Sequence, residues 1–473
     1  MPVNIQHRLS STGNSNAGYS GGNVSETVIR KGSAKSSNGG KHRHWFAVLA
    51  LGPLVAVLLI AGFSPVDAAT RTWEGGKGKN ANDWNRKQNW SGNSVPSASD
   101  IAQFDNTADS SNLAPSLAPS LASTNNSVAS ITFTSGTTNA YDISGSATLT
   151  IATGSGISNA SATDQTFSVG TVALGANQTW TTSVGGTTLD VGSVVTDGAS
   201  SYSLTKAGAG ILSLSGANTF DGGLILDGGL ILDAGTLNLN SATAPGTGTL
   251  TINAGTLDNT SGGGVTLSNN NAQAWDSDFV FTGTNDLNLG TGGVTLAGNR
   301  TVTVNGGLLT VGGIVDDGGS SYSLIKAGTG ALTLAGANTF DGGVTLDAGT
   351  LNLDNATSLG TGTFTINGGT LDNTSGSNLT LTTDNAQAWD GDFSYSGAGS
   401  KTLNLGDGDV TLGGTRTITV DSEALTIDGA IGDGGSSYGI IKDGTGTLEF
   451  RGVGASPPAR AGKSPFRRSL VRR

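Results

Sequence analysis

Leu324–Leu351 reads LIKAGTGALTLAGANTFDGGVTLDAGTL, and this stretch decides the fold. Apolar and polar residues alternate in runs of three to five, and glycine-rich segments separate the runs. Period-two alternation bounded by Gly and Asn indicates short β-strands joined by turns. No stretch after residue 69 shows a helical period of 3.6 residues. The sequence therefore predicts an all-β protein.

Related copies flank this stretch. The Ser-Ser-Tyr segments that open the copies begin at Ser200, Ser320 and Ser436, at spacings of 120 and 116 residues. Two other motifs recur at a spacing of 114 residues: GTGTLTINAGTLDN (246–259) with GTGTFTINGGTLDN (360–373), and NAQAWDSDF (271–279) with NAQAWDGDF (385–393). ANQTW, which ends at Trp180, is a shortened earlier copy. Internal repeats of this kind predict stacked units.

The longer spacing contains a tandem duplication, because GGLILD occupies both 222–227 and 228–233. Removing one copy turns the spacing of 120 into 114. An insertion of even length preserves the inward and outward alternation of a strand, whereas an odd one inverts it. A stacked β architecture can absorb such an insertion, and a tightly packed globule rarely does.

Two architectures fit the short strands: an array of sandwiches and a parallel β-solenoid. Alternating runs recur about every ten residues, as expected for regularly spaced strands; examples are 237–239, 250–252, 265–267, 287–289, 294–296 and 302–304. Aromatic residues make up only 5% of the chain, which favours the solenoid. With about 20 residues per turn, the region predicts roughly 20 turns stacked about 4.8 Å apart.

The repeated segments resemble the autotransporter-associated β-strand repeat of bacterial surface proteins. The resemblance lies in 204–220, 222–223 and 235–237, and it is closer in 324–351; a third copy begins at Ile440 and stops after Phe450. The segment with Trp73, Trp84 and Trp90 is similar to the first mature residues of such proteins. The resemblance implies a right-handed parallel β-helix passenger that is moved across an outer membrane.

The net charge of −11 is unevenly distributed. Residues 70–450 carry 33 acidic and 11 basic residues, and five of the basic residues lie between Arg71 and Lys87. Such a body has no basic footprint for nucleic acid and should be repelled by anionic lipid surfaces. We therefore expect no nucleic-acid partner.

The first 68 residues predict a long n-region followed by a secretory signal peptide. An uncharged apolar run at 45–63 follows the basic Lys41–His44 and precedes small residues. These are the three parts of a signal peptide, and we place cleavage between Ala68 and Ala69. The alternative is an uncleaved anchor, because 19 apolar residues could just span a bilayer. With cleavage, we expect export by the Sec machinery and no stable membrane span.

The mature chain has neither histidine nor cysteine. All three histidines lie in the first 44 residues, and the chain has no cysteine. This excludes Ser-His-Asp and Cys-His nucleophiles, as well as His- or Cys-rich metal sites. Oxygen-ligated calcium and carboxylate chemistry stay open, and we expect no cofactor.

The sequence divides into four predicted segments: 1–68, the n-region and signal peptide; 69–110, a Trp-rich N-terminal cap; 111–450, a repetitive β-solenoid passenger; and 451–473, a basic tail. The tail, RGVGASPPARAGKSPFRRSLVRR, departs abruptly in composition from the repeats. We expect it to be disordered or out of frame, with a polybasic anchor as the alternative. The C-terminal β-barrel translocator of the family is not recognisable in this sequence.

Four sets of residues are candidates for a site. Asp197, Asp316, Asp317 and Asp433 precede the Ser-Tyr segments in Asp-Gly turns, and 406–410 faintly resembles a calcium-binding nonapeptide; ordinary turns are the preferred interpretation. Paired carboxylates at Asp276/Asp278 and Asp390/Asp392 would suit sugar hydrolysis or lyase chemistry, but their recurrence in two units favours a structural role. Lys206, Lys326 and Lys442 recur similarly and are predicted to lie at the edges of the turns. Trp73, Trp84 and Trp90 are predicted to cap the first turn rather than to stack on sugars.

The combined prediction is a noncatalytic, exported passenger: a surface or secreted stalk, adhesin-like, that meets surface polysaccharide or another cell. Its location would be the cell surface or the medium, and the periplasm if the translocator is missing. One alternative is a carbohydrate-active β-helix enzyme, either a polysaccharide lyase or a hydrolase. Another is a truncated, nonfunctional autotransporter fragment.

Overall fold

The computed structural model describes residues 68–75, 82–106, 120–121, 126–226 and 235–452. The predicted signal segment apart from Ala68, the whole second GGLILD copy and nearly all of the basic tail lie outside these ranges. The described part is all-β, with two short 3-10 turns, η2 (Lys87–Asn89) and η3 (Ser91–Asn93). It forms a parallel β-solenoid of about 14 turns, which confirms the predicted fold class. No helix in the described part is long and apolar enough to cross a membrane.

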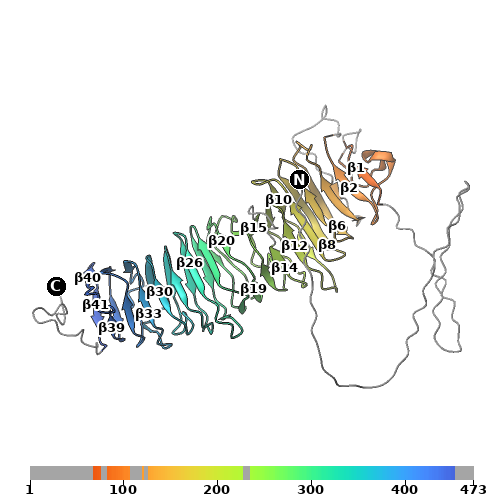
Figure 1. Cartoon of the computed structure of the whole chain (residues 1–473). Coiled ribbons are helices and arrows are strands. Elements are labelled where there is room, and N and C mark those ends of the chain that lie inside the picture. The colour runs from red at the N-terminus through yellow and green to blue at the C-terminus, as the bar shows by residue number, and fades with distance from the viewer. Residues whose placement is uncertain (1–67, 76–81, 107–119, 122–125, 227–234, 453–473) are drawn as a thin grey trace, which may run out of the picture. The chain divides into compact units, whose positions relative to one another are not determined.

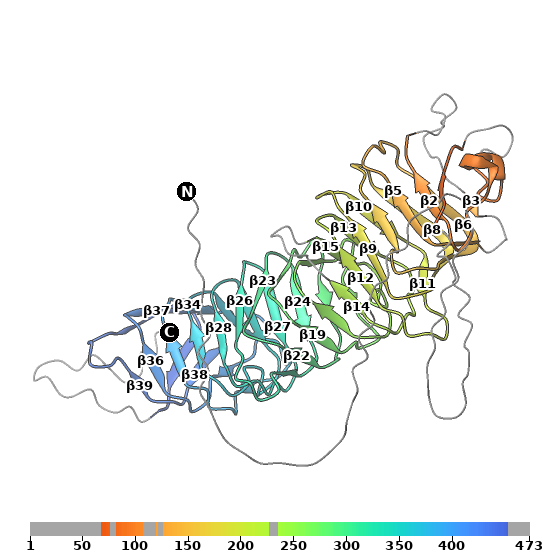
Figure 2. The same cartoon turned by 45° about the vertical axis from the view of Figure 1, so that its right-hand side comes forward.

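Strands of successive turns lie side by side and pair in parallel (Figure 1, Figure 2). They form four sheets. Sheet 1 comprises β1 (Thr70–Thr72), β2 (Ile101–Phe104), β5 (Ser130–Phe133), β7 (Ile157–Asn159), β9 (Gln178–Thr182), β12 (Leu204–Ala207), β14 (Leu224–Leu226), β16 (Leu250–Ile252), β19 (Gln273–Trp275), β22 (Val294–Leu296) and β25 (Val315–Asp316).

Sheet 2 is the longest and is built around the ten-residue strands β6 and β8. It comprises β3 (Ser120–Leu121), β4 (Asn126–Val128), β6 (Asp142–Ile151), β8 (Gln165–Leu174), β10 (Thr188–Val191), β11 (Val194–Thr196), β13 (Ile211–Leu214), β15 (Thr236–Leu239), β17 (Thr256–Asp258), β20 (Phe279–Phe281), β23 (Arg300–Val304), β26 (Leu324–Ala327), β28 (Val344–Leu346), β30 (Phe364–Ile366), β33 (Gln387–Trp389), β36 (Val410–Leu412) and β39 (Ile431–Gly432).

Sheets 3 and 4 lie later in the chain. Sheet 3 comprises β18 (Val265–Thr266), β21 (Leu287–Asn288), β24 (Leu308–Val311), β27 (Ala331–Leu334), β29 (Thr350–Leu353), β31 (Thr370–Asn373), β34 (Phe393–Tyr395), β37 (Arg416–Val420) and β40 (Ile440–Asp443). Sheet 4 comprises β32 (Leu379–Thr380), β35 (Leu403–Asn404), β38 (Ala424–Ile427) and β41 (Thr447–Phe450).

The strand order shows that the later turns are three-sided. From β16 to β25, consecutive strands belong to sheets 1, 2 and 3 in a repeating cycle. From β32 onward, the cycle runs through sheets 4, 2 and 3. Sheet 4 therefore takes over the place in the cycle that sheet 1 holds earlier.

The pairing register measures the length of a turn. Leu226 pairs with Ile252, Ile252 with Trp275, and Trp275 with Leu296, which are steps of 26, 23 and 21 residues. These turns are longer than the expected 20 residues, so the solenoid has fewer turns than predicted. The alternating pattern marks the strands and leaves the lengths of the loops between them undefined.

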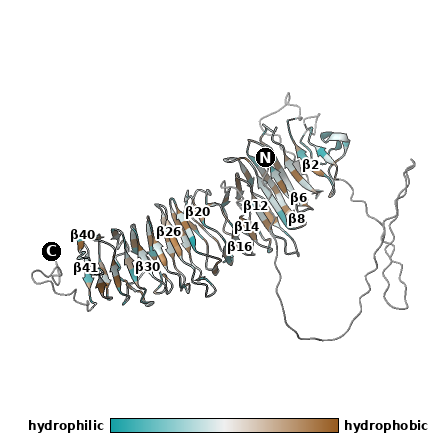
Figure 3. Ribbon diagram, viewed as in Figure 1, coloured by the Kyte–Doolittle hydropathy of each residue, from teal (hydrophilic) through white to brown (hydrophobic). Residues whose placement is uncertain are grey.

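Stacked apolar residues form the core. Leu189, Leu212, Leu237 and Leu257 pair in succession along sheet 2, and none of them is exposed to solvent. Apolar colouring gathers along the strands in Figure 3. Burying one such side chain contributes about 1.5–3 kcal/mol. Because each column continues through many turns, the apolar stacking favours addition of each turn to its neighbour.

An aromatic cluster fills the first turn. Trp73, Trp84 and Trp90 are at most 1% exposed. The Trp90 ring centroid lies 5.0 Å from that of Trp73, 4.7 Å from that of Trp84 and 5.9 Å from that of Phe104. The Trp90 indole N–H donates to the Trp84 carbonyl at 2.8 Å. Rings buried in this way are not available to stack on a sugar.

Candidate functional site

Two of the three recurring lysines lie inside the solenoid. Lys206 on β12 and Lys326 on β26 have no exposed surface. The Lys326 ammonium donates to the carbonyls of Ala327 (2.9 Å), Gly328 (2.9 Å) and Ala348 (3.0 Å). The prediction that these lysines lie at the edges of the turns is wrong, because backbone carbonyls supply acceptors in the interior.

The Lys206 ammonium is held in the same way. It donates to the carbonyls of Ala207 at 3.0 Å and Gly208 at 2.7 Å. Burial lowers the pKa of Lys206 and of Lys326 to about 8, while the carbonyl dipoles favour the charged form. Both amines are enclosed and bonded to backbone, and the Lys326 amine also bonds to the next turn through the Ala348 carbonyl.

A glycine in the next turn completes each lysine site. Gly349 has φ +70, and a Cβ atom there would lie 2.7 Å from Lys326 Nζ. A Cβ atom on Gly235 would lie 2.3 Å from Lys206 Nζ. A side chain at either position would displace the ammonium, so the lysine and the glycine that follows it form one structural unit.

The third lysine lacks this cover among the described residues. Lys442 on β40 is partly exposed and donates to the carbonyls of Asp443 (3.1 Å) and Gly444 (2.7 Å). These two acceptors match those of the other copies. The part of the chain that the structure describes contains no following turn that reaches this ammonium.

Buried asparagines in the same repeat each connect three turns. The side-chain oxygen of Asn218 accepts from the Val195 N–H at 2.8 Å, and its amide donates to the Ala244 carbonyl at 2.8 Å. Asn338 accepts from the Val315 N–H at 2.8 Å and donates to the Ser358 carbonyl at 2.6 Å. Each amide thus replaces backbone pairing where the chain turns a corner.

The aspartates of the Asp-Gly turns bind backbone. Asp197, Asp317 and Asp433 accept from the N–H groups five residues on, at 2.9, 3.0 and 3.0 Å. Burial alone would raise the pKa of Asp317, but its backbone hydrogen bonds outweigh this effect and lower the pKa. The Gly435 N–H and other backbone donors lower the pKa of Asp433. These carboxylates stabilise the turns that contain them.

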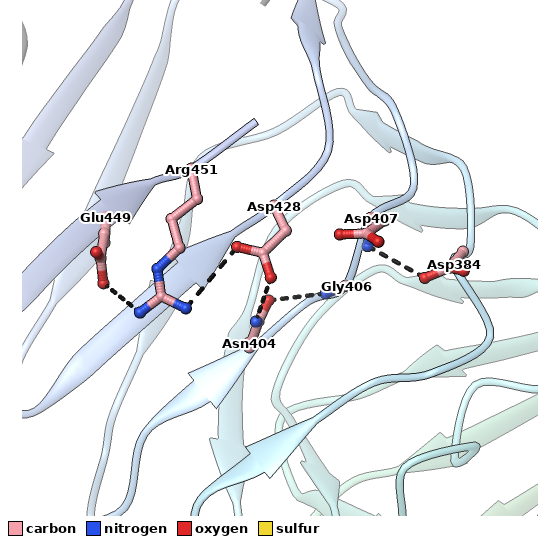
Figure 4. Close-up of polar contacts among 7 residues, drawn as sticks. All are labelled: Asp384, Asn404, Gly406, Asp407, Asp428, Glu449 and Arg451. Atoms are coloured by element: carbon pink, nitrogen blue, oxygen red, sulfur yellow. Dashed lines mark hydrogen bonds and ion pairs between the residues drawn. The ribbon is translucent and has the colours of Figure 1, made fainter. Parts of the chain in front are cut away.

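The segment 406–410 also takes part in contacts between turns (Figure 4). The Asp407 N–H donates to Asp384 at 3.2 Å. Asn404 accepts from the Gly406 N–H at 3.0 Å and donates to Asp428 at 2.6 Å. No group of three or more His, Cys, Asp or Glu residues suited to a metal ion occurs among the described residues.

The paired carboxylates have the same surroundings in both units. Asp278 accepts from the Thr301 N–H at 2.8 Å, and Asp392 accepts from the Thr417 N–H at 2.8 Å. Asp276 and Asp390 are exposed. One carboxylate of each pair therefore stabilises the next turn, in line with a structural role.

The analysis of the sequence missed the enclosed lysines, although the alternation contains a signal for them. In Leu324-Ile325-Lys326, the lysine falls on the same side of the strand as the buried Leu324. An inward polar residue beside a glycine-rich loop predicts bonds to backbone carbonyls.

Equivalent motifs occupy different sheets. Lys206 lies in sheet 1, Lys326 in sheet 2 and Lys442 in sheet 3. From one copy of the repeat to the next, the chain thus completes a whole number of turns and then continues to the next sheet of the cycle. Exposed residues at the same unit position cannot line up as a column on one side.

Comparison with known proteins agrees with this architecture. The passenger-associated-transport-repeat family matches residues 204–231, 232–258 and 324–353. The adhesin BmaC autotransporter of Brucella suis biovar 1 (strain 1330) is 34% identical over 178 residues. That match covers 34% of this chain and 5% of the adhesin, so the chain spans only a small part of this relative. No solved structure matches. The chain is therefore a β-solenoid protein that carries autotransporter passenger repeats.

Proposed function

We propose that this chain is a noncatalytic, exported passenger that serves as an adhesin-like stalk at the cell surface or in the medium. One observation carries the proposal: the recurring polar residues of the repeats are bonded between turns. Lys326, Asn338 and Asp392 each bind backbone of a neighbouring turn. Residues used in this way hold successive turns of the solenoid together and are not left free for catalysis.

Export follows from the passenger repeat, and the proposed processing site lies between Ala68 and Ala69. The Ala69 carbonyl accepts from the Ile101 N–H at 2.9 Å, and β1 begins at Thr70. The first residue after the proposed cleavage thus already takes part in the pairing between turns. We propose the segments 69–110 and 111–450 as the cap and passenger of the mature protein.

Contact with surface polysaccharide or another cell is part of the proposal. The partial similarity to an adhesin supports it. The excess of 33 acidic over 11 basic residues in 70–450 disfavours nucleic acid and anionic lipid as partners. The outward strand positions are rich in threonine, for example Thr345 and Thr365, which offer hydroxyl groups for hydrogen bonding.

The proposal is tested in two steps with the full chain. Expression in a Gram-negative host, followed by fractionation and N-terminal sequencing, should give a mature chain that begins at Ala69 outside the cytoplasm. The purified protein is then applied to cells and to arrayed polysaccharides. We expect saturable binding without any release of reducing ends or unsaturated sugars. Polysaccharide cleavage would favour the carbohydrate-active alternative, and retention in the cytoplasm would contradict the passenger role.

A further inference from the structure

Two corners of the solenoid carry the same three side chains on three consecutive turns. We call them the Tyr322 corner and the Tyr202 corner. They consist of Asn299, Tyr322 and Asp341, and of Asn177, Tyr202 and Asp221. The residues of the Tyr322 corner directly precede the paired strands β23, β26 and β28. Those of the Tyr202 corner directly precede β9, β12 and β14 in the same way, so each corner joins three adjacent turns.

Hydrogen bonds hold the Tyr322 corner together. Asp317 Oδ2 accepts from the Tyr322 N–H at 3.0 Å and from the Asp341 N–H at 3.2 Å. Asn299 Oδ1 accepts from the Ser323 N–H at 3.0 Å. The asparagine and the outer aspartate are therefore both fixed beside the tyrosine by bonds between turns.

The Tyr202 corner has the same bonds at nearly the same distances. Asp197 Oδ2 accepts from the Tyr202 N–H at 2.9 Å and from the Asp221 N–H at 3.2 Å. Asn177 Oδ1 accepts from the Ser203 N–H at 3.0 Å. Two copies of the arrangement thus exist in the described part of the chain.

These bonds leave three kinds of group free at each corner. The tyrosines are partly buried and pack against the core, whereas the asparagines and the outer aspartates are exposed. The bonds use only backbone of the tyrosine and of the outer aspartate, and only the oxygen of the asparagine. No described residue bonds to the tyrosine hydroxyls, the asparagine NH2 groups or the carboxylates of Asp221 and Asp341.

The third copy of the motif differs. Thr415 stands where the other copies have asparagine, and its hydroxyl accepts from the Gly439 N–H at 3.3 Å. Among the described residues, the corner at Tyr438 therefore has no asparagine NH2 group in this place.

We infer that the Tyr322 and Tyr202 corners each bind a neutral sugar unit of a polysaccharide. A partly exposed tyrosine ring offers an apolar surface to the C–H face of a pyranose. The asparagine NH2 group donates to sugar hydroxyls and the aspartate carboxylate accepts from them, and a few fixed polar groups of this kind orient a ligand. This assignment rests on the proposed contact with polysaccharide and names the sugar class and the residues for it.

Charge favours a neutral sugar over an anionic one. Each corner carries an exposed carboxylate, in a body with 33 acidic and 11 basic residues, so a uronate would be repelled. The cation beside Asn299 does not reverse this at both corners. Arg300 bonds to the Trp275 and Asn299 carbonyls, and the Tyr202 corner has the uncharged Gln178 at the same position.

The test uses the full chain and three immobilised neutral polysaccharides, dextran, mannan and xylan, with polygalacturonate as the anionic counterpart. Binding is followed by surface plasmon resonance. We expect saturable binding to at least one neutral polysaccharide and none to polygalacturonate. Binding to none of the neutral polysaccharides, or preference for polygalacturonate, would overturn the assignment.

Matched aspartate variants locate the sites. Asp221→Ala/Asp341→Ala should weaken binding about tenfold or more, because each corner loses a charged acceptor. Asp276→Ala/Asp390→Ala is the control, since it removes two other exposed carboxylates and should bind like the wild type. All four side chains are exposed, so circular dichroism should be unchanged. Equal affinities of the two double variants would contradict the proposal.

Tyrosine variants test the stacking. Tyr202→Phe/Tyr322→Phe keeps both rings and should retain most of the affinity, whereas Tyr202→Ser/Tyr322→Ser should lose it. Undiminished binding by the serine variant, or equal losses in both variants, would show that the rings do not contact the sugar. If the serine variant unfolds, the aspartate variants decide the question.

Adhesion to whole cells separates this assignment from the proposed function. Equal adhesion of the wild type and Asp221→Ala/Asp341→Ala would overturn the two corners as sugar sites and leave the adhesive role in place. If the wild type bound neither cells nor polysaccharides, both proposals would be wrong.

Discussion

A lysine on the inward side of a strand must find acceptors inside the solenoid. For Lys326, these acceptors are three backbone carbonyls, one of them in the next turn. Desolvation penalises the ammonium, and hydrogen bonds to carbonyls offset this penalty only while the next turn is in place. The residue therefore links the charge state of the side chain to the stacking of two turns.

This linkage predicts how stability depends on pH. The pKa of the two enclosed lysines is about 8 in the folded chain, against an ordinary value of 10.5. Between these values the unfolded chain binds more protons, so the free energy of unfolding rises as the pH increases. We expect urea midpoints to rise from about pH 8 to about pH 9.5, and the rise to disappear in the Lys206→Met/Lys326→Met double variant.

Two comparisons make this prediction specific. Lys442→Met keeps both enclosed lysines, so the rise in stability with pH should persist in this variant. Burial raises the pKa of Tyr395, which acts in the opposite direction above about pH 10, so measurements should stop below that value. Equal slopes for the wild type and the double variant would show that the enclosed lysines do not titrate in this range.

At the scale of strands and loops, the tandem GGLILD duplication allows two connections of different length to be compared. Three residues join β28 (Val344–Leu346) to β29 (Thr350–Leu353), whereas nine join β14 (Leu224–Leu226) to β15 (Thr236–Leu239). β14 and β15 each pair in parallel with strands of neighbouring turns, and so do β28 and β29. Deletion of residues 228–233 makes the two connections equal in length. We expect an unchanged circular dichroism spectrum and a Tm within a few degrees of the wild type.

The matched control is an odd deletion in the shorter connection. Removing Ala348 takes away one residue and also the carbonyl that accepts from Lys326. This variant should unfold at a clearly lower temperature. A large loss of β signal after the six-residue deletion would show that the duplication is required for the fold.

The sequence predicts strands much better than it predicts turns. The runs at 250–252 and 294–296 match β16 and β22, because alternation is a direct consequence of burial on one side of a strand. Loop length has no such periodic signal, so the number of turns was predicted too high. The lysine sites were also missed, because hydropathy places a charge outside and does not register the carbonyls of Ala327, Gly328 and Ala348.

At the scale of the whole molecule, the repeat unit and the turn are out of phase. Successive copies place their lysines in sheets 1, 2 and 3, so each copy of the motif lies one side further around. A ligand that recognised one motif would therefore meet its copies on different sides. This arrangement places the equivalent lysines of successive copies on different sides of the solenoid.

A solenoid of this kind should unfold from its ends, since each turn contacts only its neighbours. Trp90 is central to the first turn, with Trp73 at 5.0 Å and Trp84 at 4.7 Å between ring centroids. Trp90→Ala should cost the first turn about 3–5 kcal/mol. Amide hydrogen exchange should therefore accelerate in β1 and β2 while β26 and β28 keep their protection. Trp389→Ala is the interior control and should accelerate exchange in the turns on both sides of β33. If Trp90→Ala accelerated exchange along all the described strands, the turns would unfold as one cooperative unit, and a defect at one end would be transmitted throughout the array.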